Sequence, residues 1–115
     1  MAFKRHEKTP IMHRVVEHGE VLYVGGLTAT DASASMKGQT EQVLARLDDL
    51  LRQVGSDRSK VLSATIYLTD MQAKSDMNEA WTEFFGDDLP ARATLGVSAL
   101  GSPDLLIEVV TIASL

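Results

Sequence analysis

Two charged residues in the last quarter of the chain are the first candidates for chemistry. Arg92 follows Pro90-Ala91 and opens a short apolar run, and Glu108 interrupts the apolar run 105–110. An ionised carboxylate is costly to bury unless it is paired, protonated or placed in a wet pocket. A guanidinium stays charged and can hold a carboxylate through two parallel hydrogen bonds. The two residues therefore suggest a site for small organic acids. A strand, a turn and a return strand could bring Arg92 and Glu108 together across the sixteen positions that separate them. The alternatives to a binding site are therefore a structural ion pair between the two residues, or a glutamate that is partly exposed at a sheet edge.

The composition indicates one folded domain. The 115 residues have the size of a single domain, with residues 1–12 as an N-terminal extension or edge segment. A net charge of -5 argues against a nucleic-acid partner, because phosphates repel an acidic chain. Without cysteine there are no disulfides and no thiolate catalysis, which fits a reducing compartment. No apolar run has membrane-spanning length and the polar N-terminus lacks a signal-peptide core, so we expect a cytoplasmic protein with no membrane partner.

Two segments have the periodicity of amphipathic helices. Residues 36–54 place apolar side chains at helical spacing, a serine just before them can cap the first turn, and Gly55 suits the left-handed position after the last one. A second helix is expected to begin between Met71 and Ser75 and to reach about Phe85, where a Gly- and Pro-containing segment ends it.

The remaining apolar segments predict five strands, over residues 13–17, 21–28, 61–68, 93–97 and 105–113. The first two form a hairpin around His18-Gly19-Glu20. In the segment 61–68, alternation places Leu62 on the same face as Ala64, Ile66 and Leu68. The order strand, strand, helix, strand, helix, strand, strand predicts a two-layer α+β domain with both helices against one face of the sheet.

The last predicted strand is apolar on both faces, which is typical of a strand that is covered on both sides. Two helices can cover only one face of the sheet. We therefore expect a second copy of the same chain to cover the other face.

Other motifs favour structural interpretations. His13 and His18 are five positions apart, so a continuous strand would place them on opposite faces, which makes them a poor metal pair. The Gly25-Gly26 pair lacks the further glycines and the lysine of a nucleotide-binding loop. It more simply indicates a bulge, or a position where another backbone or a ligand comes close.

Five segments carry a resemblance to a known family: VLYVGG at 21–26, QTEQVL at 39–44, VLSATIYLTD at 61–70, MNEAWTEFF at 77–85 and PARAT at 90–94. In these segments the chain resembles the RidA (YjgF) family, from about residue 13 to the C-terminus. The Pro-Ala-Arg motif followed by an Ile-Glu-Val strand is the most specific part of the resemblance.

The resemblance implies a chorismate-mutase-like α+β fold assembled as a homotrimer, with a central barrel, the helices outside and clefts between subunits. It also implies hydrolysis of reactive 2-imino acids, or their enamine tautomers, to 2-oxo acids and ammonia without metal or cofactor. Arg92 would hold the substrate carboxylate, and Glu108 would place or activate the attacking water. Backbone groups near Thr94 would contact the substrate, and Gly26 and His13 complete the expected binding residues.

Three positions depart from the usual family pattern. No tyrosine stands in the segment 10–14, where His13 or Arg14 would fill its space, Gly25 replaces a serine, and Thr94 replaces a cysteine. The missing tyrosine and serine favour a second hypothesis, a non-catalytic trimer that binds small carboxylates through Arg92 or acts as a partner protein. The presence of both Arg92 and Glu108 favours the imine deaminase.

Overall fold

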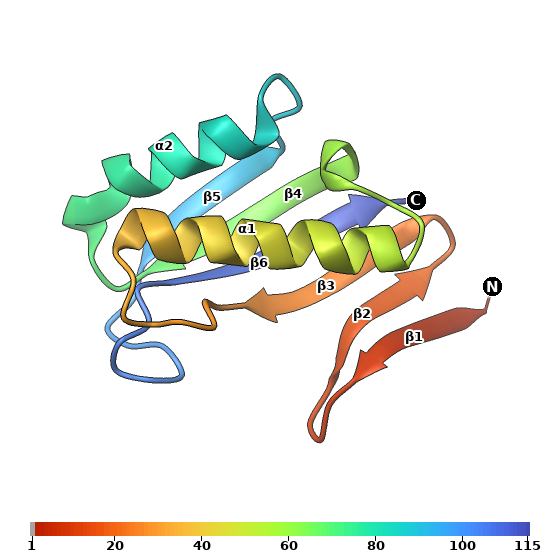
Figure 1. Ribbon diagram of the computed structural model, residues 1–115. Coiled ribbons are helices and arrows are strands. Elements are labelled where there is room, and N and C mark those ends of the chain that lie inside the picture. Colours follow the sequence, from red (N-terminus) through yellow and green to blue (C-terminus); the bar gives the residue numbers. More distant parts are fainter. Residues whose placement is uncertain (1) are drawn as a thin grey trace.

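A six-stranded sheet with two helices on one face forms the fold in the computed structural model, which describes residues 2–115 (Figure 1). The strand order is β1-β2-β3-β6-β4-β5, and neighbours run antiparallel except for the parallel pair β4 and β5. The strands are β1 (Phe3–Lys8), β2 (His13–His18), β3 (Val21–Leu27), β4 (Val61–Leu68), β5 (Ala91–Gly96) and β6 (Ile107–Ser114). The helices are α1 (Met36–Gln53) and α2 (Lys74–Phe85), and the short 3-10 turns η1 (Arg58–Lys60) and η2 (Met71–Ala73) precede β4 and α2.

The predicted two-layer α+β architecture is confirmed, including the β2–β3 hairpin and both helices. The strand β1, which the order read from the sequence did not contain, pairs with β2 at the edge of the sheet. No helix within residues 2–115 combines the length and the apolar character needed to cross a membrane.

The helix α1 follows from its sequence. Ser35 caps its first turn, since its side chain accepts a hydrogen bond from the backbone N–H of Gly38 at 3.2 Å. Gly55 follows the last turn with a φ of 91°, a value that side chains larger than glycine rarely adopt. The apolar face of α1 packs on the sheet and contributes Val43, Leu44 and Leu47 to the core, all fully buried.

One predicted face assignment in β4 is wrong. The register of β4 against β6 shifts between Val61 and Ser63, so a bulge interrupts the alternation. As a result Val61 is buried in the core, whereas Leu62 is 51% exposed instead of sharing the face of Ala64.

The strand register divides the side chains between two faces. One row of paired residues contains Val24, Thr111, Ala64 and Arg92, and it lies on the face that the helices cover, which we call the helix face. A row on the other face, which we call the open face, contains Val16, Tyr23, Ile112, Ser63 and Ala91. Paired residues share a face because side chains alternate along every strand.

The open face is apolar in its middle and has no cover in a single chain. Tyr23 is 50% exposed and Leu95 is 44% exposed, while Val110 and Ile112 of the central strand are only half-buried. Apolar surface of this kind is typical of an interface between proteins. The expectation of a cover by another chain therefore keeps its physical basis.

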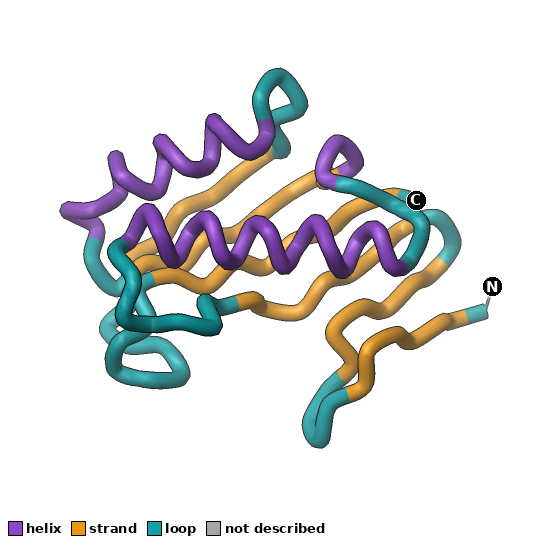
Figure 2. The backbone as a smooth tube through the Cα atoms, in the orientation of Figure 1, coloured by secondary structure: helices purple, strands orange, loops and turns teal. Residues whose placement is uncertain are grey.

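The loops that lead into α1 and β6 lie at the end of the sheet opposite the chain termini (Figure 2). The buried side chain of Gln39 links these two loops. The side-chain amide of Gln39 donates hydrogen bonds to the carbonyl oxygens of Ala32, Ala34 and Asp104, and its oxygen accepts from the N–H of Leu106 at 2.9 Å. The side-chain nitrogen and oxygen of Gln39 thus both have hydrogen-bond partners inside the protein, which fixes the loop that leads into β6.

Asp48 of α1 links the helix to the turn η1. Its carboxylate accepts hydrogen bonds from the guanidinium of Arg52 at 3.0 Å, from that of Arg58 at 3.1 Å and from the backbone N–H of Arg58 at 3.0 Å. Burial favours the neutral acid, but these hydrogen bonds outweigh burial and lower the pKa of Asp48 from its ordinary value.

We predict that Asp48→Asn lowers the free energy of unfolding at pH 7 by about 2 kcal/mol, because it removes the charge that the two arginines hold. A depressed pKa contributes stability above the ordinary aspartate pKa of about 4, and this stability disappears as the pH falls through the lower, folded-state pKa. Urea unfolding should therefore show the difference between wild type and variant shrinking from pH 5 to pH 3. Asp49→Asn on the exposed side of the same helix is the control; an equal loss there would contradict the assignment.

Candidate functional site

Arg92 lies on the edge strand β5, on the helix face. Its guanidinium carbon is 5.4 Å from the ring centre of Trp81 on α2, a cation–π contact that orients the side chain beside the helix. Burial lowers the pKa of Arg92, but an arginine at neutral pH stays charged. Within residues 2–115 no carboxylate lies within ion-pairing distance of this guanidinium. The charge is thus oriented, partly desolvated and available to an anion.

Two buried polar atoms without partners among the described residues lie on β5 and α2, the elements that carry Arg92 and Trp81. The hydroxyl of Thr94, two residues further along β5, and the side-chain oxygen of Asn78, one helical turn before Trp81, are shielded from solvent and make no hydrogen bond within residues 2–115. Buried polar atoms in proteins are nearly always satisfied, so these two are candidates for hydrogen bonds to a ligand or a second chain. Arg92, Thr94, Asn78 and Trp81 form what we call the β5 half-site.

Glu108 lies on the central strand β6, on the open face, and its carboxylate packs over Gly26. A Cβ placed on Gly26 would overlap Oε2 of Glu108 and would lie 2.9 Å from its Cδ. Gly26 lies in the irregular part of the β3–β6 pairing, between Val24 and Leu27. The expectation of a bulge is confirmed. The group that comes close to Gly26 is the side-chain carboxylate of Glu108, and not a backbone or a ligand. Glu108 and Gly26, with Tyr67 beside Glu108 on β4, form what we call the β6 half-site.

His13 begins β2 opposite Lys8 of β1, and three strands lie between β2 and β5. The preceding residue, Met12, lies close to Gly25, since a Cβ on Gly25 would be 3.5 Å from Sδ of Met12. Arg14 lies near α1 instead, where its charge lowers the pKa of Arg46 after the larger effect of burial. The segment around His13 therefore adjoins the β6 half-site and not Arg92.

A single chain does not bring Arg92 and Glu108 together. Glu108 pairs with Tyr67, which pairs with Leu95, so two strand spacings and three residues separate Glu108 from Arg92, about 14 Å between Cα atoms. The two side chains also belong to opposite faces of the sheet. The suggestion that a strand, a turn and a return strand bring the two residues together is wrong, because β4 lies between β5 and β6. The suggested structural ion pair between them is absent from the described residues.

Comparison with known proteins identifies the family of this chain. Residues 7–115 match the family described as Endoribonuclease L-PSP. The chain belongs to this family, which is also called YjgF/RidA or RutC. A RutC family protein from Haemophilus ducreyi is 32% identical over 112 residues, which cover 96% of this chain and 95% of the relative. Reactive Intermediate Deaminase A, chloroplastic, from Arabidopsis thaliana is 38% identical over 73 residues, 64% of this chain and 39% of that protein.

Solved structures of YjgF/RidA proteins share the complete fold. A YjgF family member from Neisseria meningitidis superposes with a TM-score of 0.94 at 30% identity, covering 99% of this chain and 95% of that one. A family member from Mycobacterium tuberculosis gives a TM-score of 0.90 at 26% identity and covers 99% and 100% of the two chains. The six-stranded sheet with two helices is therefore the architecture of this family.

Two residues of the β5 half-site were not predicted as site residues. Asn78 and Trp81 belong to the segment 77–85 that resembles the family, and Trp81, which is 2% exposed, is also part of the core. Its contact with Arg92 gives it a second role. Sequence spacing offered one signal: Asn78 and Trp81 are three apart, so they share a side of α2, but nothing local showed that β5 lies beneath that side.

We predict that Gly26→Ala displaces the Glu108 carboxylate at little cost in stability. The added methyl group overlaps the flexible end of a side chain, which can rotate away, so the melting temperature should fall by less than about 4 °C. The carboxyl ¹³C resonance of Glu108 should shift. Gly25→Ala is the matched control, because its Cβ makes only ordinary contacts. An unchanged Glu108 resonance in Gly26→Ala would contradict the packing described above.

Proposed function

We propose that this YjgF/RidA protein hydrolyses 2-imino acids, or their enamine tautomers, to 2-oxo acids and ammonia. The observation that carries the proposal is the guanidinium of Arg92, which is oriented by Trp81 and has no carboxylate partner among the described residues. Such a group suits the carboxylate that every 2-imino acid carries. Membership of a family with a relative named Reactive Intermediate Deaminase A supports the same chemistry.

The reaction needs positioning and proton transfer. Arg92 holds the substrate carboxylate, and the hydroxyl of Thr94 and the amide of Asn78 supply further hydrogen bonds on the same side. Glu108 accepts a proton from water as the water oxygen bonds to the carbon of the protonated imine, giving a neutral carbinolamine. Glu108 then returns that proton to the nitrogen. The C–N bond breaks as the hydroxyl group gives its proton to Glu108, which releases ammonia and leaves the 2-oxo acid. An imine is already electrophilic, so orientation and one acid–base group supply much of the catalysis.

We further propose that the site forms between two copies of the chain in a homotrimer. Arg92 lies at a sheet edge and Glu108 on the open face, so one ligand meets both most directly where the β5 edge of one protomer adjoins the open face of the next. The exposed apolar residues of the open face supply the contact surface. His13, close to Gly25, would then border the same cleft.

A non-catalytic carboxylate-binding protein is the second candidate. One observation favours it: within residues 2–115, Arg92 with Thr94 and Asn78 beside it can meet a small carboxylate without help from a neighbouring chain. A protein that used this half-site alone would bind 2-oxo acids and other small carboxylates without turning over an imine.

We predict that wild type accelerates the loss of 2-iminopropanoate, generated from alanine by an amino-acid oxidase, above the spontaneous rate. Arg92→Ala should lower kcat/KM by roughly 10²–10³-fold, since it removes the charge-assisted contacts to the carboxylate, and Arg92→Lys should recover part of the loss. Arg52→Gln, at an exposed arginine of α1, is the control and should retain activity.

Calorimetric titration with pyruvate separates the two candidates. The binding protein would be supported, and the deaminase excluded, if two results came together. Wild type would bind pyruvate and Arg92→Ala would not, and wild type would not accelerate the hydrolysis of any imine derived from an amino acid. Absence of both binding and catalysis in wild type would exclude both candidates.

Mixing inactive variants tests whether the site is shared. Arg92→Ala and Glu108→Gln subunits, unfolded together and refolded, should regain about a quarter of wild-type activity, because random trimers then restore that share of complete interfaces. Light scattering should give three times the 12.5 kDa protomer mass. Mass spectrometry of differently labelled subunits shows whether the two variants have mixed fully within the trimers. If they have mixed and no activity is recovered, both residues act in a site formed by one chain.

A further inference from the structure

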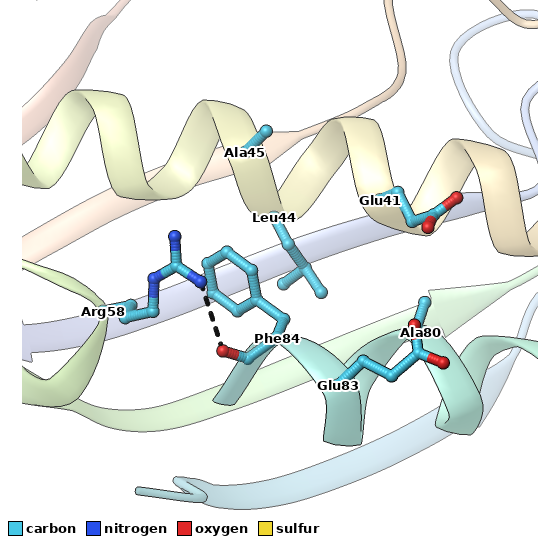
Figure 3. Close-up of a pocket in the computed structure, with 7 residues that line it drawn as sticks. All are labelled: Glu41, Leu44, Ala45, Arg58, Ala80, Glu83 and Phe84. Atoms are coloured by element: carbon cyan, nitrogen blue, oxygen red, sulfur yellow. Dashed lines mark hydrogen bonds between the residues drawn. The ribbon is translucent and has the colours of Figure 1, made fainter. Parts of the chain in front are cut away.

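A groove on the helical layer lies between α1 and α2, apart from both half-sites (Figure 3). Its volume is about 260 Å³. It occupies the side of α2 that faces α1, whereas Trp81 of α2 faces Arg92 on β5. A chain that covered the open face would leave this groove exposed, because the groove is on the opposite layer.

The floor of the groove is apolar. Leu44 of α1 and Ala80 of α2 are buried beneath it, and the half-buried ring of Phe84 forms one wall. Ala45 lines the rim on an exposed position of α1. This surface suits an aliphatic chain.

Arg58 closes one end of the groove, and its charge is already matched. Its guanidinium stacks 4.0 Å from the ring centre of Phe84, donates a hydrogen bond to the carbonyl oxygen of Phe84 at 3.3 Å and donates another to Asp48 at 3.1 Å (Figure 3). Arg58 therefore acts as a fixed wall and not as a free cation.

Two glutamates lie at the other end of the groove, Glu41 on α1 and Glu83 on α2 (Figure 3). Lys37 is 3.6 Å from Glu83 but closer to Glu79, at 2.9 Å. No cation within residues 2–115 lies within 4.0 Å of the Glu41 carboxylate. Lys37 thus lies among three carboxylates, since its pKa is raised first by the hydrogen bond to Glu79 and then by the charges of Glu83 and Glu41. One positive charge against three negative ones leaves this end of an apolar groove with an excess of negative charge.

We propose that this groove binds an aliphatic primary amine, with the ammonium group between Glu41 and Glu83 and the alkyl chain along Leu44 and Phe84. The charge complementarity selects a cation, and the apolar floor selects one that carries a hydrocarbon chain over a bare metal ion. This site is separate from the proposed deaminase site and does not depend on it.

Titration with pentan-1-amine at pH 7, followed by ¹H–¹⁵N NMR spectra, tests the proposal. Saturable shifts are expected at the amides of residues 41–45 and 80–84. Pentan-1-ol has the same chain without charge and should bind at least fivefold more weakly, and pentanoate should not bind there. Equal binding of the amine and the alcohol, or shifts spread over the whole acidic surface, would overturn the proposal.

Variants separate a built groove from general attraction to an acidic protein. The double variant Glu41→Gln/Glu83→Gln should weaken amine binding roughly 5–10-fold, the loss expected for two partly exposed ion pairs. Ala45→Leu, at an exposed helical position, should fill the groove and abolish the shifts without unfolding the protein. Asp49→Asn/Asp76→Asn removes the same charge from the same two helices outside the groove and should change the affinity less than twofold. An equal effect of both double variants, or normal binding to a folded Ala45→Leu, would overturn the proposal.

Discussion

The sheet has two faces, and the chain supplies helices for only one of them. The residues that α1 and α2 cover, such as Val24 and Ile66, form a closed core. Tyr23 and Ile112 lie on the other, apolar face, which no other part of residues 2–115 covers. Removing apolar surface from water is the main favourable term in folding and association, so such a face favours contact with another chain. This one-sided coverage determines what each strand presents to the helices and what it presents outward.

The same division separates the two charged residues of the candidate site. Arg92 lies on the helix face at the sheet edge, and Glu108 lies on the open face of the central strand, with β4 between their strands. If the two shared a row on one face, they would neutralise each other, and the guanidinium would have less affinity for a substrate carboxylate. Their separation keeps the charge of Arg92 available, and it is the reason why the proposed site combines Arg92 of one protomer with Glu108 of another.

Each half of the candidate site has a feature that is unusual in a structural interior: a glycine beneath a carboxylate in one half, and two unsatisfied polar atoms in the other. Gly26 has no side chain where the carboxylate of Glu108 lies, so the carboxylate can rest against the backbone of β3. On the other half, the hydroxyl of Thr94 and the side-chain oxygen of Asn78 are buried without partners among the described residues. The core around Leu44 and Ile66 contains no such orphan polar atoms, which is the usual condition of a purely structural interior.

Local patterns in the sequence were sufficient for the helices, the hairpin and the two-layer class, because periodicity, capping residues and turn glycines act between neighbours in the chain. The family motifs also identified Arg92 and Glu108 as residues of interest. The position of β4 between β5 and β6, the bulge that exposes Leu62, and the approach of Asn78 to the site could not be obtained in this way. Alternation assigns a side chain to a face but does not say which strand lies beside it. Strand neighbours are chosen by the packing of the whole domain, so the placement of Arg92 and Glu108 on opposite faces emerged only from the folded chain.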